Sequence, residues 1–113
     1  MLKIPYPPST NTLFTNRHGG RAKTKRYAEW SKRAGWEIKT QKPPKIEGPF
    51  SLDIIVDRPD KRKRDISNLI KAIEDTLQDV GVIEDDCLCQ ELTIRWRERE
   101  SGPLINIHAT DQP

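Results

Sequence analysis

The spacing of apolar residues changes twice between residues 50 and 96, and this constrains the fold more than any other feature. From Phe50 to Asp57 an apolar residue occupies every second position, which predicts a strand with one apolar face. From Ile66 to Val80 apolar residues recur at three- and four-residue steps, which predicts an amphipathic helix that ends at Gly81. A period of two returns from Leu88 to Trp96. We therefore expect a strand, a helix and a second strand in this order.

Weaker patterns on either side predict the remaining elements. A short strand is expected over Met1–Tyr6, an irregular loop over Thr12–Arg21, and a helix over Thr24–Gln41, where apolar residues again follow helical spacing. Ile105–Ala109 reads as a last strand, paired as a hairpin with the strand before it through the turn at residues 101–103. The pattern predicts one α/β (α+β-like) domain over residues 1–113, with two main helices packed on a mixed sheet.

The charges are segregated along the chain, although the formal net charge is only +3. Lys and Arg dominate from Arg17 to Lys45 and again from Arg58 to Arg64, whereas acidic residues concentrate between Glu74 and Glu91. Such segregation favours a polyanionic partner, and nucleic acid is the first candidate. A solvated basic face has the same composition, so charge alone does not decide between the two interpretations.

Other features limit where the chain works. Cys87 and Cys89 have no second pair to complete a zinc site, and we expect two reduced thiols in a cytosolic protein. Met1–Ile4 leads straight into prolines, so no signal peptide is expected. No apolar stretch has the length of a transmembrane helix, and no membrane partner is expected.

Two acidic positions flank the predicted helix and are candidate metal ligands. Asp65 stands where the helix begins, and it suits either a helix N-cap or a Mg²⁺ ligand. Asp86, with Glu84 and Asp85, follows the end of the helix, where an acidic turn is often only solvated. A shared site requires Asp86 to fold back beside Asp65, which strand–helix–strand connectivity does not guarantee.

Basic residues beside Asp65 are candidates for holding phosphate. The run from Lys61 to Arg64 lies between a strand and a helix, where binding loops are common, although it also suits a solvated loop. Lys71 follows Asp65 by six residues. It is either an exposed helix residue or a cation that stabilises charge in a transition state.

Three segments resemble a known family. The opening Ile4-Pro5-Tyr6-Pro7-Pro8-Ser9-Thr10-Asn11, the segment Arg64-Asp65-Ile66-Ser67-Asn68-Leu69-Ile70-Lys71 and the turn Gly81-Val82-Ile83-Glu84-Asp85-Asp86 are similar to motifs of the RusA-type Holliday junction resolvases. These are small dimeric endonucleases of bacteria and their phages. The resemblance runs nearly end to end, and the second and third segments together are its most specific part.

The resemblance implies roles for individual residues. Asp65 matches the first aspartate of the family's Asp-x-Asp-Asn motif, and Asp86 matches the aspartate of the later acidic turn, so both are implied to be catalytic and to bind Mg²⁺. Asp85 is a further candidate ligand, and Lys71 matches the lysine that assists catalysis. The residues expected to contact DNA are Lys61, Arg62, Lys63, Arg64, Asn68 and Asn11.

Ser67 departs from the family motif, because it stands where the second catalytic aspartate is expected. A neutral hydroxyl binds Mg²⁺ far less well than a carboxylate does. Three explanations are open: the protein is a DNA-binding relative with little nuclease activity, a neighbouring carboxylate such as Asp85 or Asp57 substitutes, or the residue has been changed to trap an inactive form.

The function implied by the resemblance is a Mg²⁺-dependent endonuclease that resolves four-way (Holliday) DNA junctions in recombination and repair. Its partners would be branched DNA and a second copy of itself, in the cytoplasm of a bacterium or of a phage-infected cell. One alternative is a catalytically weak or inactive junction-binding relative. Another, outside the nucleic-acid class, is a small interaction module whose basic loop binds an acidic protein.

Overall fold

A mixed sheet and two helices form the fold of the computed structural model, which describes residues 2–8, 14–17, 20–98 and 104–111. The elements are β1 (Leu2–Pro5), β2 (Phe14–Arg17), β3 (Gly20–Lys23), α1 (Lys25–Gln41), β4 (Phe50–Asp57), the 3₁₀ helix η2 (Ile66–Leu69), α2 (Ile70–Asp79), the 3₁₀ helix η3 (Asp86–Leu88), β5 (Cys89–Arg97) and β6 (Leu104–Asp111). The expected mixed sheet with two main helices is confirmed. Neither α1 nor α2 combines the length and apolar character that a bilayer-spanning helix needs.

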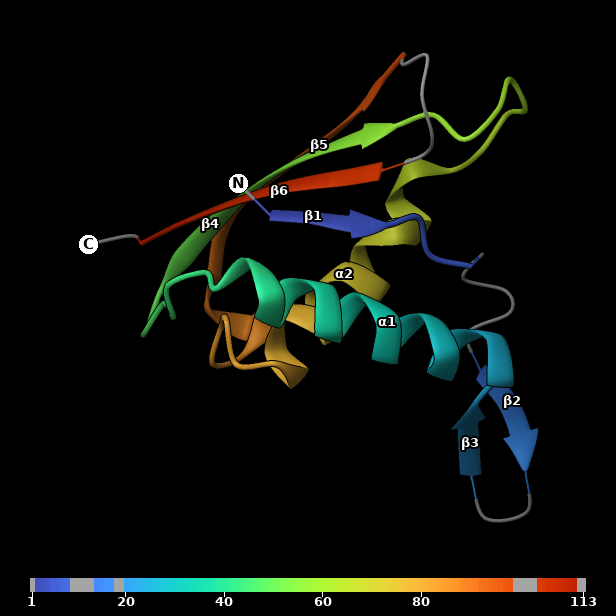
Figure 1. Cartoon of the computed structure of the whole chain (residues 1–113), viewed down its shortest axis with the longest axis horizontal. Coiled ribbons are helices and arrows are strands. Elements are labelled where there is room, and N and C mark those ends of the chain that lie inside the picture. The colour runs from blue at the N-terminus through green and yellow to red at the C-terminus, as the bar shows by residue number, and fades with distance from the viewer. Residues whose placement is uncertain (1, 9–13, 18–19, 99–103, 112–113) are drawn as a thin grey trace.

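The four strands of the main sheet run in the order β1-β6-β4-β5 (Figure 1). β4 pairs in parallel with β5 and antiparallel with β6, which in turn pairs antiparallel with β1. The predicted hairpin between the last two strands is therefore wrong. β4 buries Ile54, Ile55 and Val56 in succession, which is typical of a central strand with both faces covered. α2 carries the chain across to β5, and β6 then occupies the opposite edge of β4.

One apolar cluster joins both helices to the sheet. α1 contributes Tyr27 and Ile38, α2 contributes Ile73 and Leu77, and the sheet contributes residues such as Ile54, all fully or almost fully buried. The helices approach closely at Gly35, where an added Cβ would lie 3.1 Å from the Val80 Cγ1 atom. Close packing of the two helices therefore explains why a glycine lies inside α1.

The helix ends follow local chemistry. The Thr24 side chain accepts a hydrogen bond from the Tyr27 N–H and caps α1, and Lys42 closes α1 in the left-handed conformation with φ 51° before two prolines. The second predicted helix begins as η2 and continues as α2. Gly81, with φ 82°, follows its end as expected.

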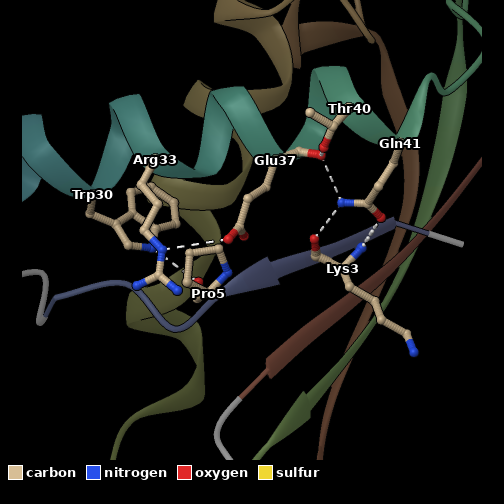
Figure 2. A network of polar contacts seen from close by, with 7 residues as sticks. All are labelled: Lys3, Pro5, Trp30, Arg33, Glu37, Thr40 and Gln41. Carbon is tan, nitrogen blue, oxygen red and sulfur yellow. Dashed lines mark hydrogen bonds and ion pairs between the residues drawn. The ribbon is translucent and has the colours of Figure 1, made fainter.

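Polar contacts fix α1 against β1 (Figure 2). The Gln41 side-chain amide donates to the Lys3 carbonyl at 2.7 Å and accepts from the Lys3 N–H at 2.8 Å. The Trp30 indole N–H donates to the Pro5 carbonyl at 3.0 Å. These bonds hold the N-terminal segment along the helix and set the position of residues 6–8.

Three expectations have different outcomes outside the core. The loop predicted over Thr12–Arg21 is wrong for its described part, because β2 and β3 pair antiparallel there. A tryptophan such as Trp36 is expected in the core or at an interface, and its 69% exposure excludes the core. Asn11 lies outside the residues that the structure describes.

Candidate active site

The basic loop, residues 58–65, folds around one carboxylate. Asp60 accepts hydrogen bonds from the Arg62 N–H at 3.0 Å and from Arg64 Nε and Nη2 at 3.1 and 2.7 Å. The hydrogen bond from Arg64 is the main reason why the pKa of Asp60 falls to about 2. An ionised Asp60 thus shapes the loop at neutral pH, and the order of the loop is encoded by residues within it.

The basic loop borders an open hollow of about 560 Å³, here called the basic groove. Five cations and one acid line it: Arg58, Lys61, Arg62, Lys63, Arg64 and Glu98. The four residues predicted to hold phosphate therefore gather around one groove, and such a density of cations suits a nucleic-acid backbone. Arg58 was missed in the sequence. It pairs with Glu98 at 2.9 Å and lies 4.8 Å from the centre of the Trp96 ring.

Asp65 ends the basic loop and caps η2. Its Oδ1 atom accepts the Ser67 N–H at 3.2 Å and the Ser67 hydroxyl at 2.7 Å. Among the described residues the Oδ2 atom has no partner, and the residue is exposed. Both interpretations of Asp65, as a helix N-cap and as a Mg²⁺ ligand, fit this geometry, because a capping carboxylate still has one oxygen free to bind a cation. Ser67 stands in place of the expected aspartate, and its hydroxyl group donates a hydrogen bond that positions Asp65.

Asn68 and Lys71 follow Asp65 on η2 and the first turn of α2. The Asn68 N–H donates to the Asp65 carbonyl at 3.2 Å, and its side chain is exposed. Lys71 is 58% exposed and pairs with Asp75, one turn later, at 3.5 Å. Asp75 also accepts from the Tyr27 hydroxyl at 3.4 Å. Lys71 is therefore accessible in the first turn of α2, with Asp75 among its contacts.

The acidic turn lies at the other end of α2. Asp85 caps η3 by accepting from the Cys87 N–H, and this bond lowers the pKa of Asp85. The Asp86 N–H donates to Gln78 Oε1 at 3.1 Å, close to the end of α2. Glu84 accepts from the Gly48 N–H, so it serves the loop before β4. The turn is thus held both by bonds within it and by bonds to α2 and to the loop before β4.

Glu74 is an acidic neighbour of Asp86 that sequence reasoning missed. It is half-buried in the second turn of α2, and burial is the first cause of its raised pKa, followed by the negative charges of Asp86 and Asp75. The Asp86 carboxylate is therefore close enough to Glu74 for their negative charges to interact. The spacing of Glu74 from Asp65 along the chain offered no signal for this, because it depends on how the turn folds back.

Asp65 and Asp86 are separated within one chain. Figure 1 shows the segment before α2 and the segment after it at opposite ends of that helix. Among the described residues, no three His, Cys, Asp or Glu side chains form a group able to hold a metal ion. The Mg²⁺ site assigned to Asp65 and Asp86 stays a prediction, and the geometry of one chain does not complete it.

Asp57, an alternative ligand considered for the missing carboxylate, has a different position. It is fully buried at the end of β4, accepts hydrogen bonds from Arg97 Nε and Nη2 at 2.7 and 3.3 Å, and accepts a third from the Asn106 amide at 3.4 Å. These donors hold the buried carboxylate in place. Its surroundings fit a structural role beneath the basic loop.

The fold and these surfaces define a class: a small α+β protein with a basic groove next to an exposed carboxylate. Comparison with known proteins gives the family. The model of the endodeoxyribonuclease RusA family matches residues 5–108. A crossover junction endodeoxyribonuclease RusA of Aquifex aeolicus (strain VF5) is 35% identical over 100% of this chain and 91% of its own length. One from Enterobacteria phage HK97 is 31% identical over 96% of this chain and 91% of its own. The chain belongs to the RusA endodeoxyribonuclease family, as its motifs indicated.

Proposed function

We propose that the protein is a Mg²⁺-dependent endonuclease that resolves four-way DNA junctions as a homodimer, in the cytoplasm of a bacterium or phage-infected cell. The observation that carries this proposal is the position of Asp65. An exposed carboxylate with an unshared oxygen follows directly on a groove lined by five cations. The names of the two relatives, both crossover junction endodeoxyribonucleases, support a branched DNA substrate.

In this proposal each part of the site has one task. Lys61, Arg62 and Lys63 hold backbone phosphates and so set the register of the strand beside Asp65. Ser67 orients the Asp65 carboxylate through its hydroxyl. Lys71 places a positive charge near the strand, where it stabilises charge that develops on the phosphate. Mg²⁺, which suits the hard oxygens of Asp65 and of phosphate, would supply Lewis-acid chemistry and an activated water.

The separation of Asp65 from Asp86 supports the homodimer. Protein ligands of one Mg²⁺ must all lie within its short coordination sphere. The two aspartates of one chain lie toward opposite ends of α2, so Asp86 would reach Asp65 only from a second copy. A two-fold dimer of this kind builds two equivalent sites, which suits paired cuts in symmetric strands.

The test is cleavage of a synthetic four-way junction with and without Mg²⁺, read on a denaturing gel. We expect the wild type to nick the junction and not a linear duplex of the same sequence, and Asp65→Asn to bind without cutting. Binding by the wild type without cleavage at any Mg²⁺ concentration would instead support the second candidate function, a junction-binding relative. The observation in favour of that candidate is Ser67, whose hydroxyl already donates to Asp65.

A further inference from the structure

A second hollow, of about 590 Å³, lies on the other side of Arg64 and has no role in the proposal above. It is here called the α1 hollow, because one wall is formed by side chains of α1 and the other by residues 6–8. Its lining includes Tyr6, Pro8, Arg26, Trp30, Arg33 and Arg64. The volume is within the range of about 300–1,000 Å³ that small-molecule sites occupy.

The walls of the α1 hollow are held in place. Arg26, Trp30 and Arg33 occupy steps of four and three residues on α1, so they share one face of the helix. Trp30 is buried and stacks on Tyr27 with ring centres 6.0 Å apart. Its indole N–H donates a hydrogen bond to the Pro5 carbonyl. Figure 2 shows Trp30 and Arg33 on the side of α1 that faces the N-terminal segment. The hollow is thus a formed surface between two fixed elements.

The chemistry of the α1 hollow combines cations with an aromatic and proline wall. Arg26, Arg33 and Arg64 give three positive charges against the single acid Glu29. Arg26 is exposed and has no partner among the described residues, whereas Arg33 pairs with Glu37 at 3.5 Å. Tyr6 is half-buried, and Arg64 lies 5.9 Å from the centre of its ring. Cations beside an aromatic ring are the usual surface for a single-stranded nucleotide.

Arg64 lines both the basic groove and the α1 hollow, so the two are contiguous. Asp65 is the next residue in the sequence, although it lines neither surface. A strand that follows the basic groove past Arg64 would enter the α1 hollow.

We infer that the α1 hollow binds one unstacked nucleotide of the DNA strand at the branch, with its phosphate on Arg26 and its base against Tyr6. This inference rests on the proposed function and adds a second subsite to it. It gives the protein a way to distinguish branched from linear DNA, because a strand leaving a duplex at a branch exposes a base at low cost.

Two measurements on the whole protein, made without divalent cations so that no strand is cut, test the inference. The first is the salt dependence of junction affinity. Arg26→Ala should weaken binding and reduce the slope of log affinity against log salt by about 0.9, the value for one lost phosphate contact. Lys32→Ala removes the same charge from an exposed position of α1 outside the hollow, and it should leave the slope unchanged.

The second measurement is photocrosslinking from 5-iododeoxyuridine placed at the branch. We expect a crosslink to the peptide that contains Tyr6, retained in Tyr6→Phe and lost in Tyr6→Leu, with circular dichroism showing both variants folded. If Arg26→Ala matches Lys32→Ala, or if no crosslink reaches Tyr6, the inference is overturned, while junction cleavage by the wild type would leave the proposed function standing. Failure of the wild type to bind any junction would overturn both.

Discussion

Mixing two inactive variants tests how Asp65 and Asp86 meet. Asp86 is hydrogen-bonded to Gln78, the ninth residue of α2, and η2 adds four residues before that helix. With rises of about 1.5 Å per residue in α2 and about 2.0 Å in η2, the path from Asp65 to Gln78 is roughly 20 Å. Two oxygens bound to one Mg²⁺ lie no more than about 4 Å apart, twice the bond length of about 2.1 Å. We therefore expect each site to take its second ligand from another copy of the chain.

The variants are Asp65→Asn and Asp86→Asn, and each alone should be inactive. If each site takes Asp65 from one subunit and Asp86 from the other, a mixed dimer keeps one intact site. Random exchange in an equal mixture makes about half of the dimers mixed, so about a quarter of the wild-type sites return. The readouts are nicking of a four-way junction and luminescence of Tb³⁺ bound at the site, which does not depend on turnover.

The matched control mixes Asp65→Asn with the double variant Asp65→Asn/Asp86→Asn, which forms dimers but has no intact site. Native mass spectrometry verifies that subunits exchange in both mixtures. An equal mixture of the single variants that contains mixed dimers, yet neither binds Tb³⁺ nor nicks DNA, would refute the argument from α2. Sedimentation of the wild type as a monomer at micromolar concentration would refute it at an earlier step.

Three further predictions concern the loop, the motif and the core. Replacing Arg62 and Lys63 with Ala should reduce the salt slope of junction binding by about two, and an unchanged slope would show that the basic groove is not the phosphate site. Ser67→Asp should lower the Mg²⁺ concentration for half-maximal cleavage, whereas Ser67→Asn should not; equal Mg²⁺ dependence in both would contradict the account of the motif. Burial raises the pKa of Tyr27 to about 12, against about 10 in an unfolded chain, so the protein should lose stability as the pH rises from about 10 to about 12. Denaturant unfolding should show less loss in Tyr27→Phe.

Periodicity was enough to predict the central elements, because burial imposes it. The strand at β4 and the helix at η2 and α2 follow directly from the spacing of residues such as Ile54 and Ile73. The sequence did not predict β2 and β3, because these short strands carry no alternating apolar pattern. The pairing of β6 was not predicted for another reason: the sequence Ser101-Gly102-Pro103 is a local signal for a hairpin, whereas the place of β6 between β1 and β4 depends on the whole sheet.

The site was predictable in its residues and not in its geometry. The sequence places Lys61 and Arg64 in one loop, and the loop indeed forms one groove. It does not show that Arg64 is bound to Asp60, because the bidentate contact depends on how the loop turns. It also does not show that Asp57 is buried. A strand with strict alternation would expose that residue, yet Arg97 from β5 and Asn106 from β6 enclose it.

The place of β6 has a consequence for how the chain folds during synthesis. β6 consists of the last residues that the structure describes, and it lies between β1 and β4. Until it emerges from the ribosome, β1 has no strand to pair with and one edge of β4 stays open. The pairing of β1 with β6 spans nearly the whole chain, and contacts of such long range form slowly. A partly made chain therefore lacks its finished sheet, so the basic loop, which leaves from β4, gains its final support only when translation has passed β6.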